Sequence, residues 1–177
     1  MSEKSPGARA VSTFQIEDVF LVASDCWVVR DFNSTAQVAE FAFGQSTGVD
    51  NEALVQVRTP TNGGDDLYIL RYFVNAEVQL LKPGKKPDKD AVASREDFLA
   101  VLKFTVATDY RCPKEAIEDK DAIGAFSRNA HFHAWPYLRE EIHSMCCRLR
   151  VPRVTLPMLR PDQLGSSTDH KSVPKSD

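Results

Sequence analysis

The sequence lacks any hydrophobic run long enough to cross a membrane. Its apolar stretches are short, whereas a spanning helix needs roughly 18 to 20 consecutive apolar residues. The first residues, MSEKSPGARAVST, contain no apolar signal core. We therefore expect a protein that stays in the cytoplasm, where it is made, and does not insert into membranes.

The sequence also lacks a large excess of charge of one sign, and it lacks the cysteine spacing of a disulfide framework. The formal net charge is only -3, so no basic field attracts nucleic acid. Four cysteines, Cys26, Cys112, Cys146 and Cys147, show no framework spacing, which predicts reduced thiols rather than disulfides. The remaining composition, 42% hydrophobic and 27% charged, is typical of a globular domain that can bury a core.

Alternation of apolar and polar residues predicts an antiparallel sheet. From Thr13 to Val29 the pattern predicts a long, bent strand, with Phe14, Ile16, Asp18, Phe20 and Val22 on one face. Shorter strands are expected at 37–43 and 52–59, followed by a turn at 60–66. Two long strands follow, at 67–81 and 98–110. The second places Phe98, Ala100, Leu102, Phe104 and Val106 on one face.

Helices are expected only near the C-terminus. One is predicted around 119–127, and another begins with Pro136 at its first position and ends before Pro152. Its apolar stripe consists of Trp135, Leu138, Ile142, Met145 and Leu149. Strands followed by helices predict an α+β fold, a four-stranded antiparallel sheet with C-terminal helices on one face.

The polar segments divide the chain around one domain, at 13–160. Residues 1–12 are predicted to be a flexible N-terminal lead, and 161–177 a polar, disordered tail. The segment 82–97 is a charged loop, longer than a tight turn requires.

No set of residues predicts catalysis or a cofactor. Five possible zinc ligands, His131, His133, His143, Cys146 and Cys147, match no zinc-finger spacing, and buried cysteines with surface histidines explain them more simply. A metal-binding regulatory protein using this cluster is an alternative. Arg139 and Glu140 could form a site, or only local ion pairs at a helix start.

Aromatic residues exceed what one small sheet and one helix can cover. They alternate along the strands: Phe14, Phe20, Trp27, Phe41, Phe43, Tyr68, Tyr72 and Phe73. Such a surplus fits a well-filled core, an oligomer, or apolar grooves offered to a partner.

The segment WPYLREEIHSMCCRLRVP, residues 135–152, resembles the signature of the SecB export chaperones. The matching positions are Trp135, Pro136, Tyr137, Arg139, Glu140, Ile142, Ser144, Met145, Arg148, Val151 and Pro152. The stretches VTLPML, residues 154–159, and TFQIEDVF, residues 13–20, resemble the family's segment after that proline and its first strand.

The resemblance implies an ATP-independent holdase, not an enzyme, that binds unfolded, nascent or export-bound polypeptides without metal or cofactor. It implies a homotetramer, built as a dimer of dimers. Client-binding residues would be Phe41, Phe43, Leu102, Phe104 and Val106. The oligomer interface would use Leu138, Ile142, Met145 and Leu149.

Departures from the family concern the export route. Ala23, Trp27 and Lys103 stand where the family presents acidic side chains to the SecA motor, and the tail does not resemble the motor-docking tail. Delivery of clients to SecA is one of two functional alternatives. A SecB-like chaperone dedicated to one client, such as the antitoxin of a toxin–antitoxin system, is the other.

Overall fold

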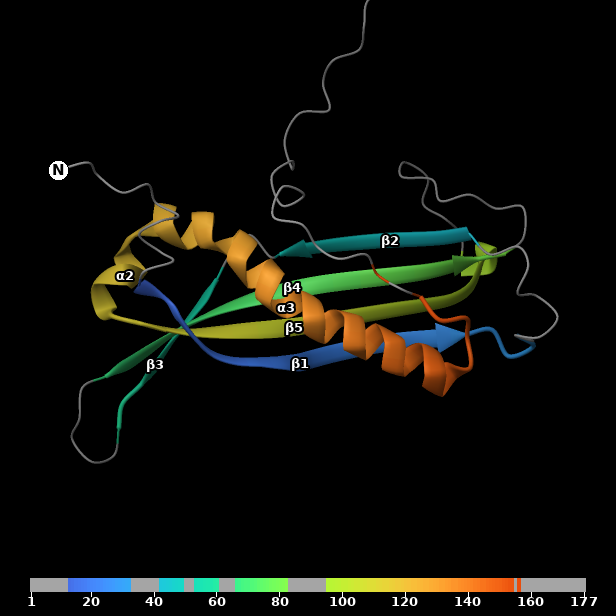
Figure 1. The fold of residues 1–177 in the computed structure, drawn as a ribbon, viewed down its shortest axis with the longest axis horizontal. Helices are drawn as coiled ribbons and strands as arrows, with labels where there is room; N and C mark the ends of the chain where they lie inside the picture. Colours follow the sequence, from blue (N-terminus) through green and yellow to red (C-terminus); the bar gives the residue numbers. More distant parts are fainter. Residues whose placement is uncertain are drawn as a thin grey trace, which may run out of the picture.

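In a computed structural model, the chain forms an antiparallel sheet with a long helix across one face (Figure 1). The structure describes residues 13–32, 42–49, 53–60, 66–82, 95–154 and 156, of which 42–49 are described by their backbone. The elements are β1 (Gln15–Val28), β2 (Ala42–Val49), β3 (Leu54–Arg58), β4 (Leu67–Leu81), η2 (Arg95–Asp97), β5 (Phe98–Cys112), α2 (Lys114–Glu118) and α3 (Lys120–Leu149). The predicted α+β fold is confirmed.

The sheet has four strand positions. Its order is β1-β5-β4-β2, and β3 also pairs with β4. β2 pairs with the second half of β4 and β3 with its start, so both lie along the same edge. The predicted sheet is therefore confirmed, although β2 starts only at Ala42. The rest of the strand expected at 37–43, including Phe41, lies outside the described residues.

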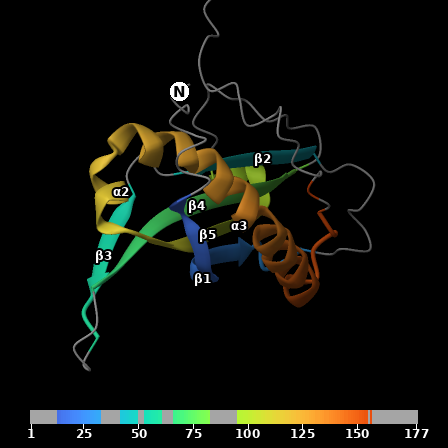
Figure 2. The same ribbon diagram turned by 60° about the vertical axis from the view of Figure 1, so that its left-hand side comes forward.

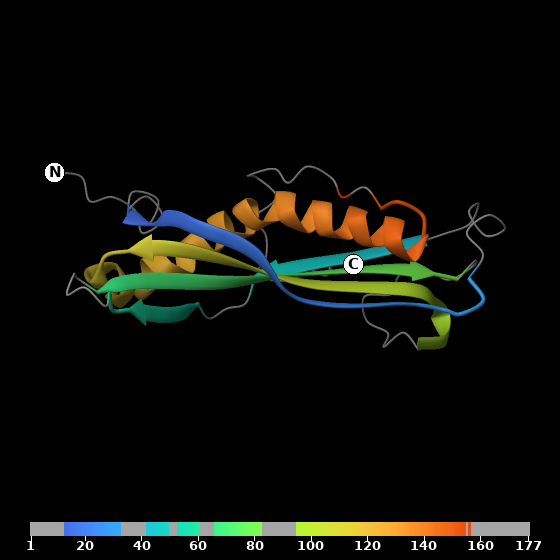
Figure 3. The ribbon, with the colours of Figure 1, turned by 90° about the horizontal axis from the view of Figure 1, so that it is seen from below.

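β4 and β5 form as predicted because their apolar residues alternate. In β4 the side chains from Tyr72 to Leu80 are alternately buried and half-buried. The matching face of β5 pairs with these buried positions, for example Phe104 with Ala76. Both lie on the face that α3 covers, which Figure 3 shows edge-on. The main core lies between this face and the helix.

β1 is bent, as predicted, but Ile16 and Phe20, which were predicted to share one face, lie on opposite faces of the sheet. The register with β5 shifts between Ile16 and Asp18 and again between Leu21 and Ala23. A bulge inserts one extra residue, so the side chains beyond it point to the opposite face. Ile16 therefore lies opposite Tyr110 on the helix side, whereas Phe20 lies opposite Ala107 on the outer side.

α3 is one helix, which corrects the two helices predicted from the sequence. Pro136 lies inside α3, not at its first position. A row of buried residues at every fourth position continues through the proline: Ala122, Phe126, Ala130, Ala134, Leu138, Ile142 and Cys146. Burial of this whole row outweighs the local cost of the proline.

The spacing of the buried row also sets the direction of α3. Rows of every fourth residue are inclined by about 26° to a helix axis. A helix that packs through such a row crosses a twisted sheet obliquely, and α3 contacts β1, β2, β4 and β5 in turn (Figure 1). In the part of the chain that the structure describes, no helix is long and apolar enough to span a membrane.

Candidate functional site

A groove of about 410 Å³ runs between α3 and the extended segment that follows it. Pro136, Arg139, Glu140 and His143 line it from the helix, and Val154 and Leu156 line it from the segment. Val154 and Leu156 are buried side chains of the main core cluster, 9% and 2% exposed, so they back the groove but offer little of their own surface to it. Glu140 and His143 are exposed at the rim. The accessible surface of the groove is therefore largely polar, and the exposed ring of Pro136 belongs to its apolar part.

The end of α3 directs the chain into position beside the groove. The N–H of Val151 donates to the carbonyl of Cys146 at 3.1 Å, and the N–H of Arg150 donates to that of Cys147 at 3.3 Å. This double pattern closes a helix C-terminus, and it requires the left-handed conformation that Arg150 adopts, with φ at 54°. Pro152 then prevents further helix, as the sequence predicted.

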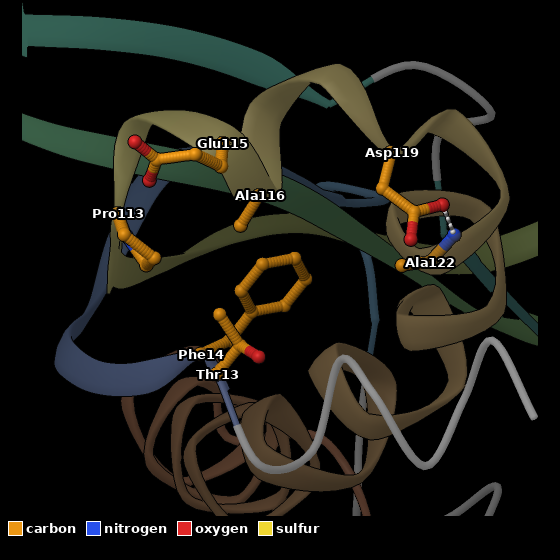
Figure 4. A pocket seen from close by; sticks show the side chains of 7 residues that line it. All are labelled: Thr13, Phe14, Pro113, Glu115, Ala116, Asp119 and Ala122. Atoms are coloured by element: carbon orange, nitrogen blue, oxygen red, sulfur yellow. Dashed lines mark hydrogen bonds between the residues drawn. The ribbon is translucent and has the colours of Figure 1, made fainter. Parts of the chain in front are cut away.

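A second, smaller pocket of about 230 Å³ lies at the junction of β1, α2 and α3 (Figure 4). Phe14 forms its floor and packs edge-on against Phe126, with ring centroids 4.9 Å apart. Asp119 at its rim caps α3, because its Oδ1 accepts the N–H of Ala122 at 2.9 Å. The carboxylate therefore serves the helix start, and the pocket assembles no catalytic set.

The predicted client-binding residues of β5 lie in the core. Leu102 and Val106 are 0% exposed and Phe104 is 2% exposed, all beneath α3. A client could contact them only if α3 left the sheet. Phe43 is the second residue of β2, opposite Leu80, and its side chain lies outside the described part.

The predicted interface stripe of α3 divides into two parts. Leu138 and Ile142 are 0% exposed and pack against the protein's own sheet. Met145 and Leu149 are half-buried beside the same cluster, so part of their surface remains available to another subunit. Their role in oligomerisation stays a prediction.

The possible zinc ligands are separated. Cys146 is buried in the core, whereas Cys147 is exposed. The Nδ1 atom of His133 lies 2.8 Å from the hydroxyl oxygen of Tyr110, and the ring of His131 packs edge-on against Trp135. Among the residues that the structure describes, no three His, Cys, Asp or Glu side chains come together as a metal site. The metal-binding alternative gains no support.

Burial shifts the ionisation of the groups around α3. It lowers the pKa of His131 and of His133 and raises the pKa of the Cys146 thiol. It also raises the pKa of the Tyr110 hydroxyl. At neutral pH these groups are therefore uncharged, which suits a packed core rather than acid–base chemistry.

On the outer sheet face, charged side chains are paired across β4 and β5. The guanidinium of Arg71 donates two hydrogen bonds of 2.7 Å to Asp109, whose side chain is 3% exposed. Lys103 lies 3.4 Å from Glu77. These carboxylates are therefore neutralised within the sheet.

Sequence reasoning found part of the groove. It singled out Pro136, Arg139, Glu140 and His143, but gave them other roles. It missed the contribution of Val154 and Leu156, because burial of a segment after a helix depends on how the chain turns back. The apolar alternation in VTLPML was the available signal.

Comparison with known proteins identifies the fold. No protein-family model matches the chain, and no curated protein matches it. A solved structure does: a SecB-like chaperone of Mycobacterium tuberculosis in complex with a ChAD peptide from the HigA1 antitoxin. The match has a TM-score of 0.62 and 19% sequence identity, and it covers 88% of this chain and 98% of that one. The chain therefore has a SecB-like fold.

Proposed function

We propose that this protein is an ATP-independent chaperone of the SecB type, which holds unfolded or export-bound polypeptides. One observation carries the proposal: the chain has a SecB-like fold, and a groove lies in the segment that resembles the SecB signature. Burial of apolar client side chains stabilises the complex by about 25 cal/mol per Å². Such binding depends little on client sequence.

Two partners follow from this proposal. The first is the client itself, and the second is further copies of the chain, as a homotetramer in which Met145 and Leu149 contribute the half-buried surface. The working species would then have about four times the mass of the 19.8 kDa chain.

A dedicated client, such as an antitoxin, is the second candidate function. The matched chaperone was solved with an antitoxin peptide, which favours this candidate. The paired charges of Glu77 and Asp109 also favour it over delivery to the SecA motor, because a basic partner gains little from neutralised carboxylates.

The proposal is tested by aggregation of several unrelated, chemically unfolded proteins, without nucleotide, alongside mass by light scattering. We expect dose-dependent suppression by a tetramer. Suppression limited to one client would support the dedicated chaperone, and no suppression of any client would refute the proposed function.

A groove-filling variant tests the site. His143 is exposed at the rim, so His143→Trp should fill the groove without disturbing the core. We expect client affinity to fall about tenfold or more, because the client's apolar side chain is displaced. Cys147→Trp is the matched control, since Cys147 is exposed on α3 but does not line the groove. Equal effects of both substitutions would exclude the groove.

A further inference from the structure

We propose that the outer edge of β3 binds an extended client segment as an added β-strand. This inference rests on the proposed function and adds a second contact site to it. β3 hydrogen-bonds to β4 along one side, and within the described parts of the chain no other strand pairs with it. The unpaired edge of a strand presents backbone N–H and C=O groups that can bind another strand.

β3 carries exposed apolar side chains on both faces of the sheet, although Gln56 and Arg58 share the outer face with Leu54. Leu54 lies opposite Arg71 on the outer face, whereas Val55 and Val57 lie opposite Leu70 and Tyr68 on the helix side. Leu54, Val55 and Val57 are 47%, 39% and 54% exposed. Soluble proteins usually protect such an edge with lysine, proline or a bulge. An added strand would cover these side chains on both faces.

The length of β3 decides between a second copy of the chain and a client. β3 has five residues, whereas a stable protein–protein interface uses about 20 to 30 residues a side. Pairing of two copies through β3 alone would therefore be too small to persist. A single extended segment needs no larger surface, because backbone hydrogen bonds give affinity and a few side-chain contacts give preference.

The neighbouring side chains define the chemistry of this segment. Alternating β-branched residues would pack against Val55 and Val57. Arg58 ends the strand with a half-exposed side chain, and Asp109, which lies 3.9 Å from its guanidinium, already pairs with Arg71. An acidic residue near Arg58 would therefore strengthen binding. The proposed ligand is an extended, β-branched segment with an acidic end.

β3 lies away from the groove, which Pro136 to His143 line in the second half of α3. Figures 1 and 2 place β3 at the end of the sheet far from the C-terminal end of α3. A client long enough to span both sites would bind the second site intramolecularly once the first is occupied. Two weak contacts can then give tight binding of long chains and weak binding of short ones.

The edge is tested with two labelled peptides of alternating valine and threonine that end in glutamate, one of them N-methylated at two adjacent central residues. Adjacent N–H groups point to opposite edges of a strand, so the methyl groups block both edges without changing the side chains. Fluorescence anisotropy should show about tenfold weaker binding of the methylated peptide, the effect of losing one or two net hydrogen bonds. Equal binding of both peptides, or binding of neither, would overturn the proposal.

Variants of β3 locate the binding. Val55→Lys with Val57→Lys should remove the difference between the peptides, whereas Val55→Thr with Val57→Thr keeps strand propensity and should retain it. Circular dichroism checks the fold of both variants. If the lysine variant still discriminates between the peptides, the site lies elsewhere. If it lowers the mass measured by light scattering, the edge binds a second copy and the client assignment is wrong.

The two proposals fail separately. A protein that suppresses aggregation but binds both peptides equally is a chaperone without an edge site. A protein that distinguishes the peptides but suppresses no aggregation has an edge site and is not a holdase.

Discussion

Replacing Pro136 by alanine should stabilise the folded protein. Pro136 lies inside α3, where it has no N–H to donate to the carbonyl four residues earlier and its ring crowds that carbonyl. Proline in a helix interior is about 3 kcal/mol less favourable than alanine. Its ring is exposed at the groove, so little packing is lost. Adjustment of the helix around the proline reduces this gain, so we expect Pro136→Ala to raise the free energy of unfolding by about 1 to 3 kcal/mol.

Urea unfolding followed by far-UV circular dichroism, at a fixed protein concentration, measures this gain. For a chain of this size it corresponds to a rise in Tm of roughly 2 to 12 °C. Pro152→Ala is the control, because Pro152 follows the helix and restricts the unfolded chain there. The Pro152→Ala substitution should lower the free energy of unfolding by up to about 1 kcal/mol. A Pro136→Ala protein that is no more stable than the parent would refute the reasoning, as would shifts of the same sign in both variants.

Two further predictions concern the same helix. Arg150→Gly should stabilise the protein by about 1 kcal/mol, because Arg150 is left-handed with φ at 54°, whereas Arg148→Gly inside α3 should destabilise it by a similar amount. Unequal urea midpoints in these directions would support the role of the cap, and a loss of stability in both would contradict it. Burial lowers the pKa of His131 and His133, so the unfolded chain binds protons more readily. The free energy of unfolding should therefore be full above about pH 7 and fall as the pH drops through about 6.5, the usual histidine pKa. His131→Phe should flatten this fall in urea midpoints measured from pH 7.5 to 5.5. An unchanged slope would assign the proton uptake to another group.

Strands with strict alternation were predictable from the sequence. β4 coincides with the predicted 67–81, and β5 extends the predicted 98–110 by two residues. In β4 burial alternates from Arg71 to Leu80, and β5 is buried along most of its length, so the apolar pattern was long enough to indicate both strands. β2 was misplaced because its sequence, AFGQSTGV, is polar and contains two glycines. Pairing with β4 along eight residues defines this strand, and that pairing is long-range information.

The predictions from the sequence were wrong where a local preference of the chain competed with tertiary packing. Pro136 is a favourable first residue for a helix, which predicted a helix start. The row of buried residues from Ala122 to Cys146 requires one continuous helix instead. Similarly, the apolar face of β5 was visible in the sequence, but the element that covers it was not. Leu102, Phe104 and Val106 could be read as a surface until α3 was placed over them.

The position of the core limits where a client can bind. On the helix side, α3 already occupies the apolar surface of β4 and β5, so binding there would require opening the main core cluster. Opening it would expose several fully buried side chains, at roughly 1.5 to 3 kcal/mol each, which is comparable to the whole stability of a small domain. The helix side of the groove, at Pro136, Glu140 and His143, and the edge of β3 require no such opening, because these residues are already accessible. Under the proposed function the protein works without nucleotide, so it has no external energy to open its core. We therefore expect clients to use these two margins of the sheet–helix sandwich, with the core intact.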